Sequence, residues 1–95
     1  MSTEVLATAR LRLGRIVSTP QALEQLTQND ISLGIRRHQA GDWGDVTEND
    51  RQTNESALIE HTRLLSLYHA TSGIKFWLIT EADRSATTVL LPEDY

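Results

Sequence analysis

The 95-residue chain has no cysteine, a single lysine and a single phenylalanine, and its apolar residues never run on for long. Without cysteine it cannot form disulfides, thiolate zinc sites or a cysteine nucleophile. No segment has the apolar length of a membrane span, and the N-terminus lacks the apolar core of a secretory signal. These absences predict a cytoplasmic protein without a membrane partner.

Positive charge is also scarce. Nine Lys and Arg residues stand against thirteen Asp and Glu residues, and the formal net charge is −4. Proteins that grip nucleic acid by its phosphates carry a basic excess, so direct nucleic-acid binding is not expected. Residues 1–47 hold five acids and five bases, whereas residues 48–95 hold eight acids and four bases. The whole negative charge therefore lies in the second half.

Length and composition predict one small folded domain over residues 1–95. The chain is 39% hydrophobic and 23% charged, which is ordinary for a globular protein, but a chain this short buries only a thin core. Alternating apolar residues predict a first strand over residues 10–17. Thr19 followed by Pro20 is typical of a helix start, because Thr caps and Pro suits the first helical position.

Two further helices are expected before residue 60. Asp30 is expected to cap the first of them, and Gly41 to end it. Thr47, with an acid three residues later, predicts a polar surface helix over residues 48–59.

After residue 63 the apolar period changes to two, which predicts strands joined by polar turns. The expected strands cover residues 64–69, 74–80 and 86–91. The fold class is therefore α+β: an N-terminal strand, two or three short helices, then a three-stranded antiparallel C-terminal meander. The residues expected to supply most of its buried face are Leu65, Leu67, Ile74, Phe76, Leu78, Val89 and Leu91.

The loop Gly-Asp-Trp-Gly-Asp at residues 41–45 has two interpretations. In the first, Trp43 turns inward as a lid on the core, and its N–H binds Asp42, Asp45 or a nearby carbonyl, while His38 and the aspartates stay on the rim. In the second, the loop is a binding site made of His38, Asp42, Trp43 and Asp45. Sequence alone leaves both open.

A metal-free ribonuclease would need an acid–base pair and an arginine facing the phosphate. His69, Glu81, Arg84 and Thr87 supply the right residue types near strand ends. The simpler interpretation is that the residues of the 81–85 turn only solvate it.

Neither a metal nor a cofactor is expected. The acids of residues 42–55 lack the central glycine and closing glutamate of a calcium loop, and the three histidines are too scattered for zinc. The chain contains no phosphate-binding glycine loop and no nucleophile elbow.

Several stretches resemble a family of small bacterial proteins. They are Gly-Asp-Trp-Gly-Asp within residues 37–45, the segment 13–24, and residues 64–95 with the motif Ile-Thr-Glu-Ala-Asp-Arg-Ser-Ala-Thr-Thr. Members of this family occur on chromosomes, plasmids and integrative elements and are described as hypothetical or plasmid-related. Some carry a restriction-system label, which a chain this short without a cofactor motif does not support. The resemblance implies relatives but no catalytic residues.

Two functions follow as hypotheses. The first is a non-enzymatic accessory or modulator protein of bacteria or mobile elements that binds a protein partner through an acidic face. One form of it would inhibit a host defence system by occupying a basic nucleic-acid-binding surface. The alternative is the small metal-independent ribonuclease-like enzyme described above.

Overall fold

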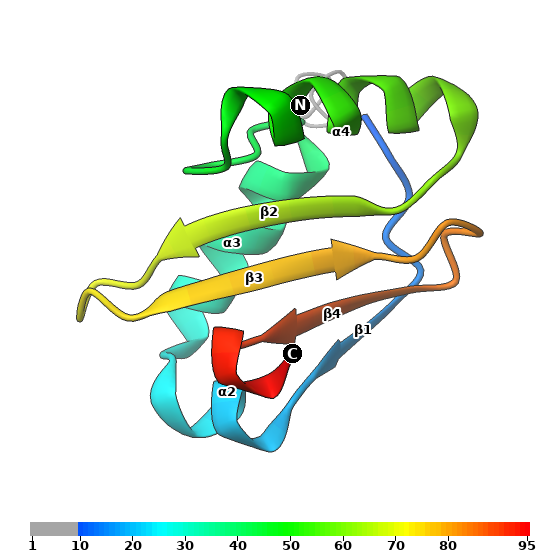
Figure 1. The fold of residues 1–95 in the computed structure, drawn as a ribbon. Coiled ribbons are helices and arrows are strands. Elements are labelled where there is room, and N and C mark those ends of the chain that lie inside the picture. Colours follow the sequence, from blue (N-terminus) through cyan, green and yellow to red (C-terminus); the bar gives the residue numbers. More distant parts are fainter. Residues whose placement is uncertain (1–9) are drawn as a thin grey trace, which may run out of the picture.

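A four-stranded sheet with three α-helices makes up residues 10–95, the part of the chain that the computed structural model describes (Figure 1). Residues 1–9 of the predicted domain lie outside this part. The elements are β1 (Arg15–Ser18), α2 (Pro20–Gln25), α3 (Gln28–Gln39), α4 (Glu48–Glu60), β2 (Leu64–His69), β3 (Lys75–Thr80), β4 (Ala86–Leu90) and the 3₁₀ turn η1 (Pro92–Asp94). The α+β class is confirmed.

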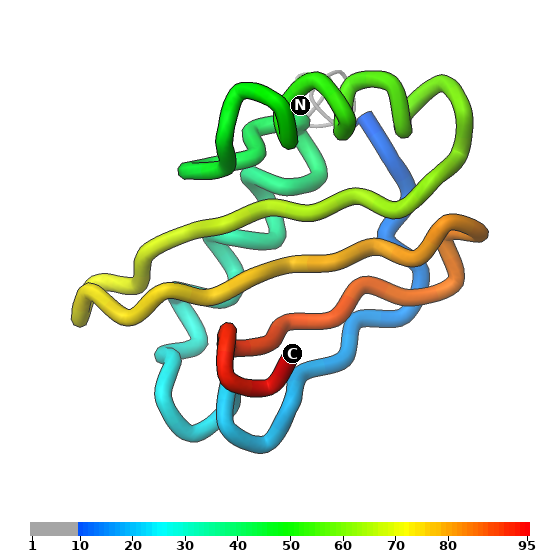
Figure 2. Tube along the Cα trace, viewed as in Figure 1, coloured from blue at the N-terminus to red at the C-terminus, as the bar shows by residue number. Residues whose placement is uncertain are grey.

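The strands are arranged in the order β1-β4-β3-β2. The pairs β2–β3 and β3–β4 are antiparallel, as the predicted meander requires, whereas β1 lies beside β4 and runs parallel to it (Figure 2). The sheet is therefore mixed. The first strand is shorter than predicted and begins at Arg15, because Gly14 adopts φ +64° and interrupts the extended chain just before it.

Side-chain caps explain where the helices begin. Thr19 and Thr47 accept hydrogen bonds from backbone N–H groups three residues later, as their sequence pattern predicts. The expectation for α3 was wrong by one turn. Its cap is Thr27, whose hydroxyl accepts from the Asp30 N–H while the Asp30 carboxylate accepts from the Thr27 N–H. Asp30 is thus the third residue of the helix in a reciprocal capping box.

One face of the sheet packs against the helices. Its buried side chains are Leu64, Ser66, Tyr68, Phe76, Leu78, Thr80, Thr87 and Val89. The rings of Tyr68 and Phe76 approach α3 at Gly34, where an added Cβ would lie 3.0 Å from the Phe76 ring. A helical residue without a side chain therefore lets α3 lie close to the sheet.

The prediction for β2 was wrong in phase. Leu65 and Leu67 were expected in the core, but Leu64, Ser66 and Tyr68 take the buried positions. Because side chains alternate along a strand, one misplaced residue reverses the whole set. Phe76, Leu78, Val89 and Leu91 are buried as predicted, whereas Ile74 is only partly buried.

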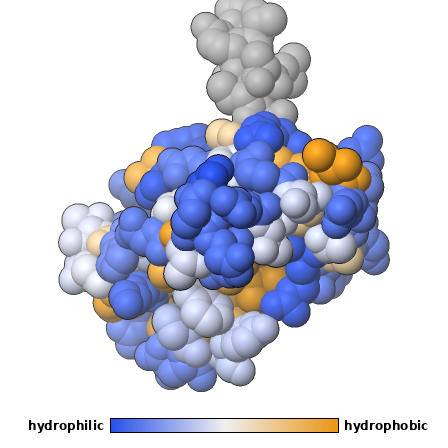
Figure 3. Space-filling model, turned by 45° about the horizontal axis from the view of Figure 1, so that its top comes forward, coloured by the Kyte–Doolittle hydropathy of each residue, from blue (hydrophilic) through white to orange (hydrophobic). Residues whose placement is uncertain are grey.

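The opposite surface of the sheet is the helix-free face. Its residues are Leu65, Leu67, Trp77, Ile79, Thr88 and Leu90, of which Ile79 and Leu90 are buried, and among the described residues only η1 and Tyr95 fold across it. Figure 3, which tilts the molecule so that α4 comes forward, shows a mostly hydrophilic surface broken by separate apolar patches.

Candidate functional site

Trp43 belongs to the core. Its side chain is 3% exposed, which confirms that the indole tucks inward. The acceptor of its N–H differs from the expectation: Nε1 donates to Glu55 Oε2 of α4 at 2.9 Å rather than to an aspartate. Its ring meets the His38 imidazole edge-on, with 5.6 Å between the ring centroids. The loop therefore uses its aromatic residue to join α3 to α4.

The backbone of the same loop pairs with the outer edge of β2. The Leu67 N–H donates to the Trp43 carbonyl at 3.0 Å, and the Asp45 N–H donates to the Leu67 carbonyl at 2.8 Å. Between them Gly44 adopts φ +76°, and a Cβ there would overlap the Leu67 carbonyl. Only glycine fits so close an approach.

The side chain of Asn54 in α4 pairs with the backbone of Leu65, two residues before Leu67 on the same edge. Its Nδ2 donates to the Leu65 carbonyl at 2.7 Å, and its Oδ1 accepts from the Leu65 N–H at 3.1 Å. An uncovered edge strand would offer these groups to another chain. The loop and Asn54 together pair the backbone N–H and carbonyl groups of Leu65 and Leu67, so this part of the β2 edge is closed to another strand.

The two aspartates of the loop are exposed but engaged. Asp42 accepts from Arg37 Nε at 2.7 Å, and the hydrogen bond from Arg37 lowers the pKa of Asp42 below its usual value. Asp45 lies 2.8 Å from Nδ1 of His69. Each aspartate therefore has its own partner, and neither lies in a shared notch with Trp43.

His38 is not on the rim, contrary to the expectation, but is fully buried between α3 and the sheet. Its Nδ1 lies 2.6 Å from Ser66 Oγ, and its Nε2 lies 2.9 Å from Thr80 Oγ1. The chain continues from Thr80 to Thr87 at 2.7 Å and ends at the Leu13 carbonyl, also at 2.7 Å.

The end of this chain fixes its direction. A carbonyl only accepts, so Thr87 donates to Leu13, Thr80 donates to Thr87, and Nε2–H of His38 donates to Thr80. Nδ1 is then left to accept from Ser66. Burial, the main cause, and the positive charge of Arg84, the second, together lower the pKa of His38 to about 4. His38 is a neutral structural group that links α3 to three strands.

The four residues of the ribonuclease hypothesis do not come together. His69 pairs with Lys75 at one end of β2 and β3, whereas Glu81 follows the other end of β3. Five residue steps separate these ends, or roughly 17 Å. Thr87 is buried in the hydrogen-bonded chain of His38.

Arg84 is tied to the backbone. In the left-handed conformation at φ 63°, it donates to the carbonyls of Ala57 in the last turn of α4 at 3.0 Å and of Thr62 just after that helix at 2.8 Å. It also donates to the carbonyls of Glu81 and Ala82 within its own turn. Its first role is to hold the β3–β4 turn against α4.

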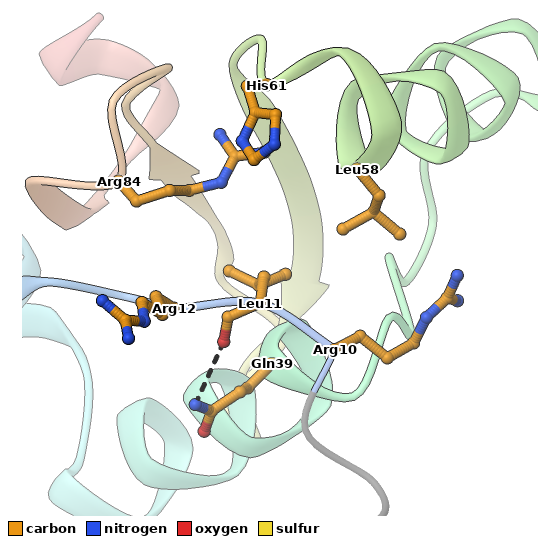
Figure 4. A pocket seen from close by; sticks show the side chains of 7 residues that line it. All are labelled: Arg10, Leu11, Arg12, Gln39, Leu58, His61 and Arg84. Atoms are coloured by element: carbon orange, nitrogen blue, oxygen red, sulfur yellow. Dashed lines mark hydrogen bonds between the residues drawn. The ribbon is translucent and has the colours of Figure 1, made fainter.

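A histidine that the sequence analysis did not select does lie near Arg84. His61 caps α4 in the left-handed conformation and lines a cavity of about 490 Å³ with Arg84 (Figure 4). We name this cavity the basic pocket; its lining residues are Arg10, Leu11, Arg12, Gln39, Leu58, His61 and Arg84. Four segments that lie far apart in the sequence create this pocket, so no local motif predicts it.

The helix-free face carries an aromatic cluster that the sequence analysis also missed. Trp77 and Tyr95 meet at 5.2 Å between ring centroids, and Arg63 donates to the Tyr95 hydroxyl at 2.9 Å. Beside them lies a shallow cavity of about 190 Å³, lined by Ile79, Thr88 and Leu90 among others. We name Arg63, Trp77 and Tyr95 the aromatic cluster.

Among residues 10–95, no group of three or more acidic or histidine side chains is arranged to hold a metal ion. No helix in this part of the chain has the length and apolarity to cross a membrane. Comparison with known proteins finds no matching family model, no matching curated protein and no matching solved structure.

Proposed function

We propose that this protein is a non-enzymatic accessory module that binds a cytoplasmic protein partner through its helix-free face. The observation that supports the proposal most strongly is the aromatic cluster. Tyr95 is 71% exposed, and Trp77 beneath it is half-buried, so both rings remain open to a partner.

Trp, Tyr and Arg are the residues most enriched at the energetic centres of protein interfaces. In this protein the side chains of the aromatic cluster are already ordered before any partner binds. Tyr95 is fixed by Arg63 and Trp77, and the neighbouring Asp94 accepts from the Thr19 hydroxyl at 2.6 Å. A surface whose side chains are already ordered loses less entropy on binding.

Charge supports a basic partner. Helix α4 runs beside β2 and carries four acids against one base, Arg51, for a net charge of −3. A partner docked across the sheet would meet this acidic helix at its rim, where complementary charge steers association. The resemblance to proteins of mobile elements favours a modulator, and inhibition of a nucleic-acid-binding defence protein is the form we propose.

The dispersed ribonuclease residues favour binding over catalysis. His69 already contacts Asp45 at the far end of the strand from Glu81, and Thr87 is buried. No second function is proposed on them.

The proposal is tested by affinity capture from a bacterial lysate with matched variants. Trp77→Ser removes the centre of the cluster, and Leu33→Ser is the control, because Leu33 is a large apolar residue on α3, 50% exposed and away from the helix-free face. We expect a protein that the wild type and Leu33→Ser retain and that Trp77→Ser loses, with retention weakening as salt rises. Equal retention by both variants would contradict the proposal.

A further inference from the structure

We propose that the basic pocket binds a small phosphorylated molecule, a phosphate monoester with an apolar or aromatic body. The inference is independent of the protein-binding proposal, because the pocket and the helix-free face use different residues. Arg12, His61 and Arg84 line it from separate segments, and Figure 4 shows the Arg84 guanidinium beside the His61 ring, with Leu11 below them and the Arg12 side chain leading away from both.

The charge of the pocket is one-sided. Of residues 10–95, three guanidinium groups and one imidazole line it and no carboxylate does, in a chain whose net charge is −4. Arg10 is neutralised by Glu55 at 3.0 Å. Arg12 and Arg84 make no salt bridge within residues 10–95. Two positive charges therefore remain for a ligand.

Arg84 is the fixed part of this site. Its Nη1 and Nη2 groups donate to carbonyls of α4, of Thr62 and of its own turn, which fixes the guanidinium and leaves its positive charge and its Nε–H for an anion. Arg12 lines the same pocket from the segment before β1 and is exposed, so its long side chain is free to turn toward a bound anion. A phosphate dianion offers three oxygens and so can engage guanidinium groups from two directions, whereas a carboxylate fits one bidentate partner.

The rest of the lining favours a small molecule over a polynucleotide. Leu11 and Leu58 supply apolar walls, and a cavity of about 490 Å³ lies within the range of small-molecule sites. The Gln39 amide donates to the Leu11 carbonyl at 3.3 Å, which leaves its own oxygen as a polar contact for the ligand body. The acidic helix α4 would repel a long polyanion from the rim.

The experiment follows backbone amide resonances of the full chain during titration with adenosine monophosphate. Inorganic phosphate tests the anion alone, adenosine tests the body alone, and a single-stranded oligonucleotide tests polymeric phosphate. We expect adenosine monophosphate to shift residues 10–12, 61 and 84, inorganic phosphate to shift the same residues more weakly, and adenosine to shift none.

Two variants sharpen the test. Arg12→Gln should raise the dissociation constant about tenfold, the loss expected for one charge-assisted contact. Arg36→Gln is the control, because Arg36 is exposed on α3 and does not line the pocket, and it should leave the constant unchanged. If Arg12→Gln fails to fold, His61→Gln replaces it with the same expected direction.

The proposal is overturned if adenosine monophosphate shifts no resonances at millimolar concentration, or if its shifts map outside the pocket. Equal weakening by the Arg36 and Arg12 variants would also overturn it. Tighter binding of the oligonucleotide at the same residues would replace the small molecule by polymeric phosphate and contradict the assignment.

Discussion

Both faces of the sheet carry several apolar side chains, but the two faces differ in how far these side chains are buried. On the covered face, Phe76, Leu78 and Val89 are sealed beneath helices, and the described residues leave no buried polar side-chain atom unpaired. On the helix-free face, Leu65, Leu67 and Trp77 stay partly open to solvent. The side chains of the covered face are buried when the chain folds. The helix-free face keeps apolar surface that folding leaves exposed to solvent.

Adjacent residues show the contrast most clearly. Phe76 and Trp77 are neighbours in β3 that point to opposite faces, and Phe76 is the more deeply buried. We infer that the covered face determines stability and that the helix-free face determines binding. Each prediction below tests this division, from the largest expected effect to the smallest.

Phe76→Ala should lower the free energy of unfolding by roughly 3–5 kcal/mol, because the ring lies within the core against Tyr68 and Gly34. A domain of this size holds about 5–15 kcal/mol in total, so the variant should be barely folded. Denaturant unfolding measures the change, with exposed Ile59→Ala as the control. A loss similar to that of the control would place Phe76 outside the core.

Acid should weaken the covered face through His38. Its folded pKa of about 4 lies below the ordinary value of 6.5, so the unfolded chain binds the proton first as the pH falls. Stability is then full above pH 6.5 and falls by about 3 kcal/mol as the pH approaches 4.

The pH dependence is measured by thermal unfolding between pH 5 and pH 7, above the range where carboxylates titrate. His38→Gln should remove most of the slope in this window, whereas His61→Gln, at an exposed position, should keep it. An unchanged slope in His38→Gln would mean that the buried imidazole does not control acid sensitivity.

Asn54→Leu should lower the free energy of unfolding by about 2 kcal/mol. The substitution removes both partners of the Leu65 backbone, and an unsatisfied buried group costs about 1–3 kcal/mol before water compensates it. Asn49→Leu, at an exposed position of α4, is the control. Because the edge of β2 would open, the Asn54 variant should also aggregate more readily in light scattering.

Trp77→Ser should have the smallest effect on stability, about 1 kcal/mol, since the indole is only partly buried. Chemical denaturation measures it, and circular dichroism should show an unchanged fold. A loss as large as that of Phe76→Ala would make Trp77 a core residue and remove the distinction between the faces.

The local features of the fold were predictable from sequence. Thr19 and Thr47 start helices because their hydroxyls satisfy the first free N–H groups, and this needs only neighbouring residues. The antiparallel strands from Leu64 onward follow from period-two alternation. The inward turn of Trp43 follows from the gain of burying a large ring in a thin core.

Features that depend on distant contacts were not predictable. Leu64, Leu65 and Leu67 allow either phase of β2, and Ser66 faces inward because it meets His38, 28 residues earlier. The parallel pairing of β1 with β4 and the convergence of four segments on the basic pocket have the same origin. A local pattern of residues does not show which distant segments will pack against it.

The most direct test of the division between faces is site-specific cross-linking. The chain has no cysteine, so Thr88→Cys on the helix-free face and Ser32→Cys on exposed α3 each give one attachment point for a photoreactive group. With the partner captured by the wild type, we predict efficient cross-linking from position 88 and little from position 32. Cross-linking from position 32 alone, or of a second copy of this chain from position 88, would contradict the account.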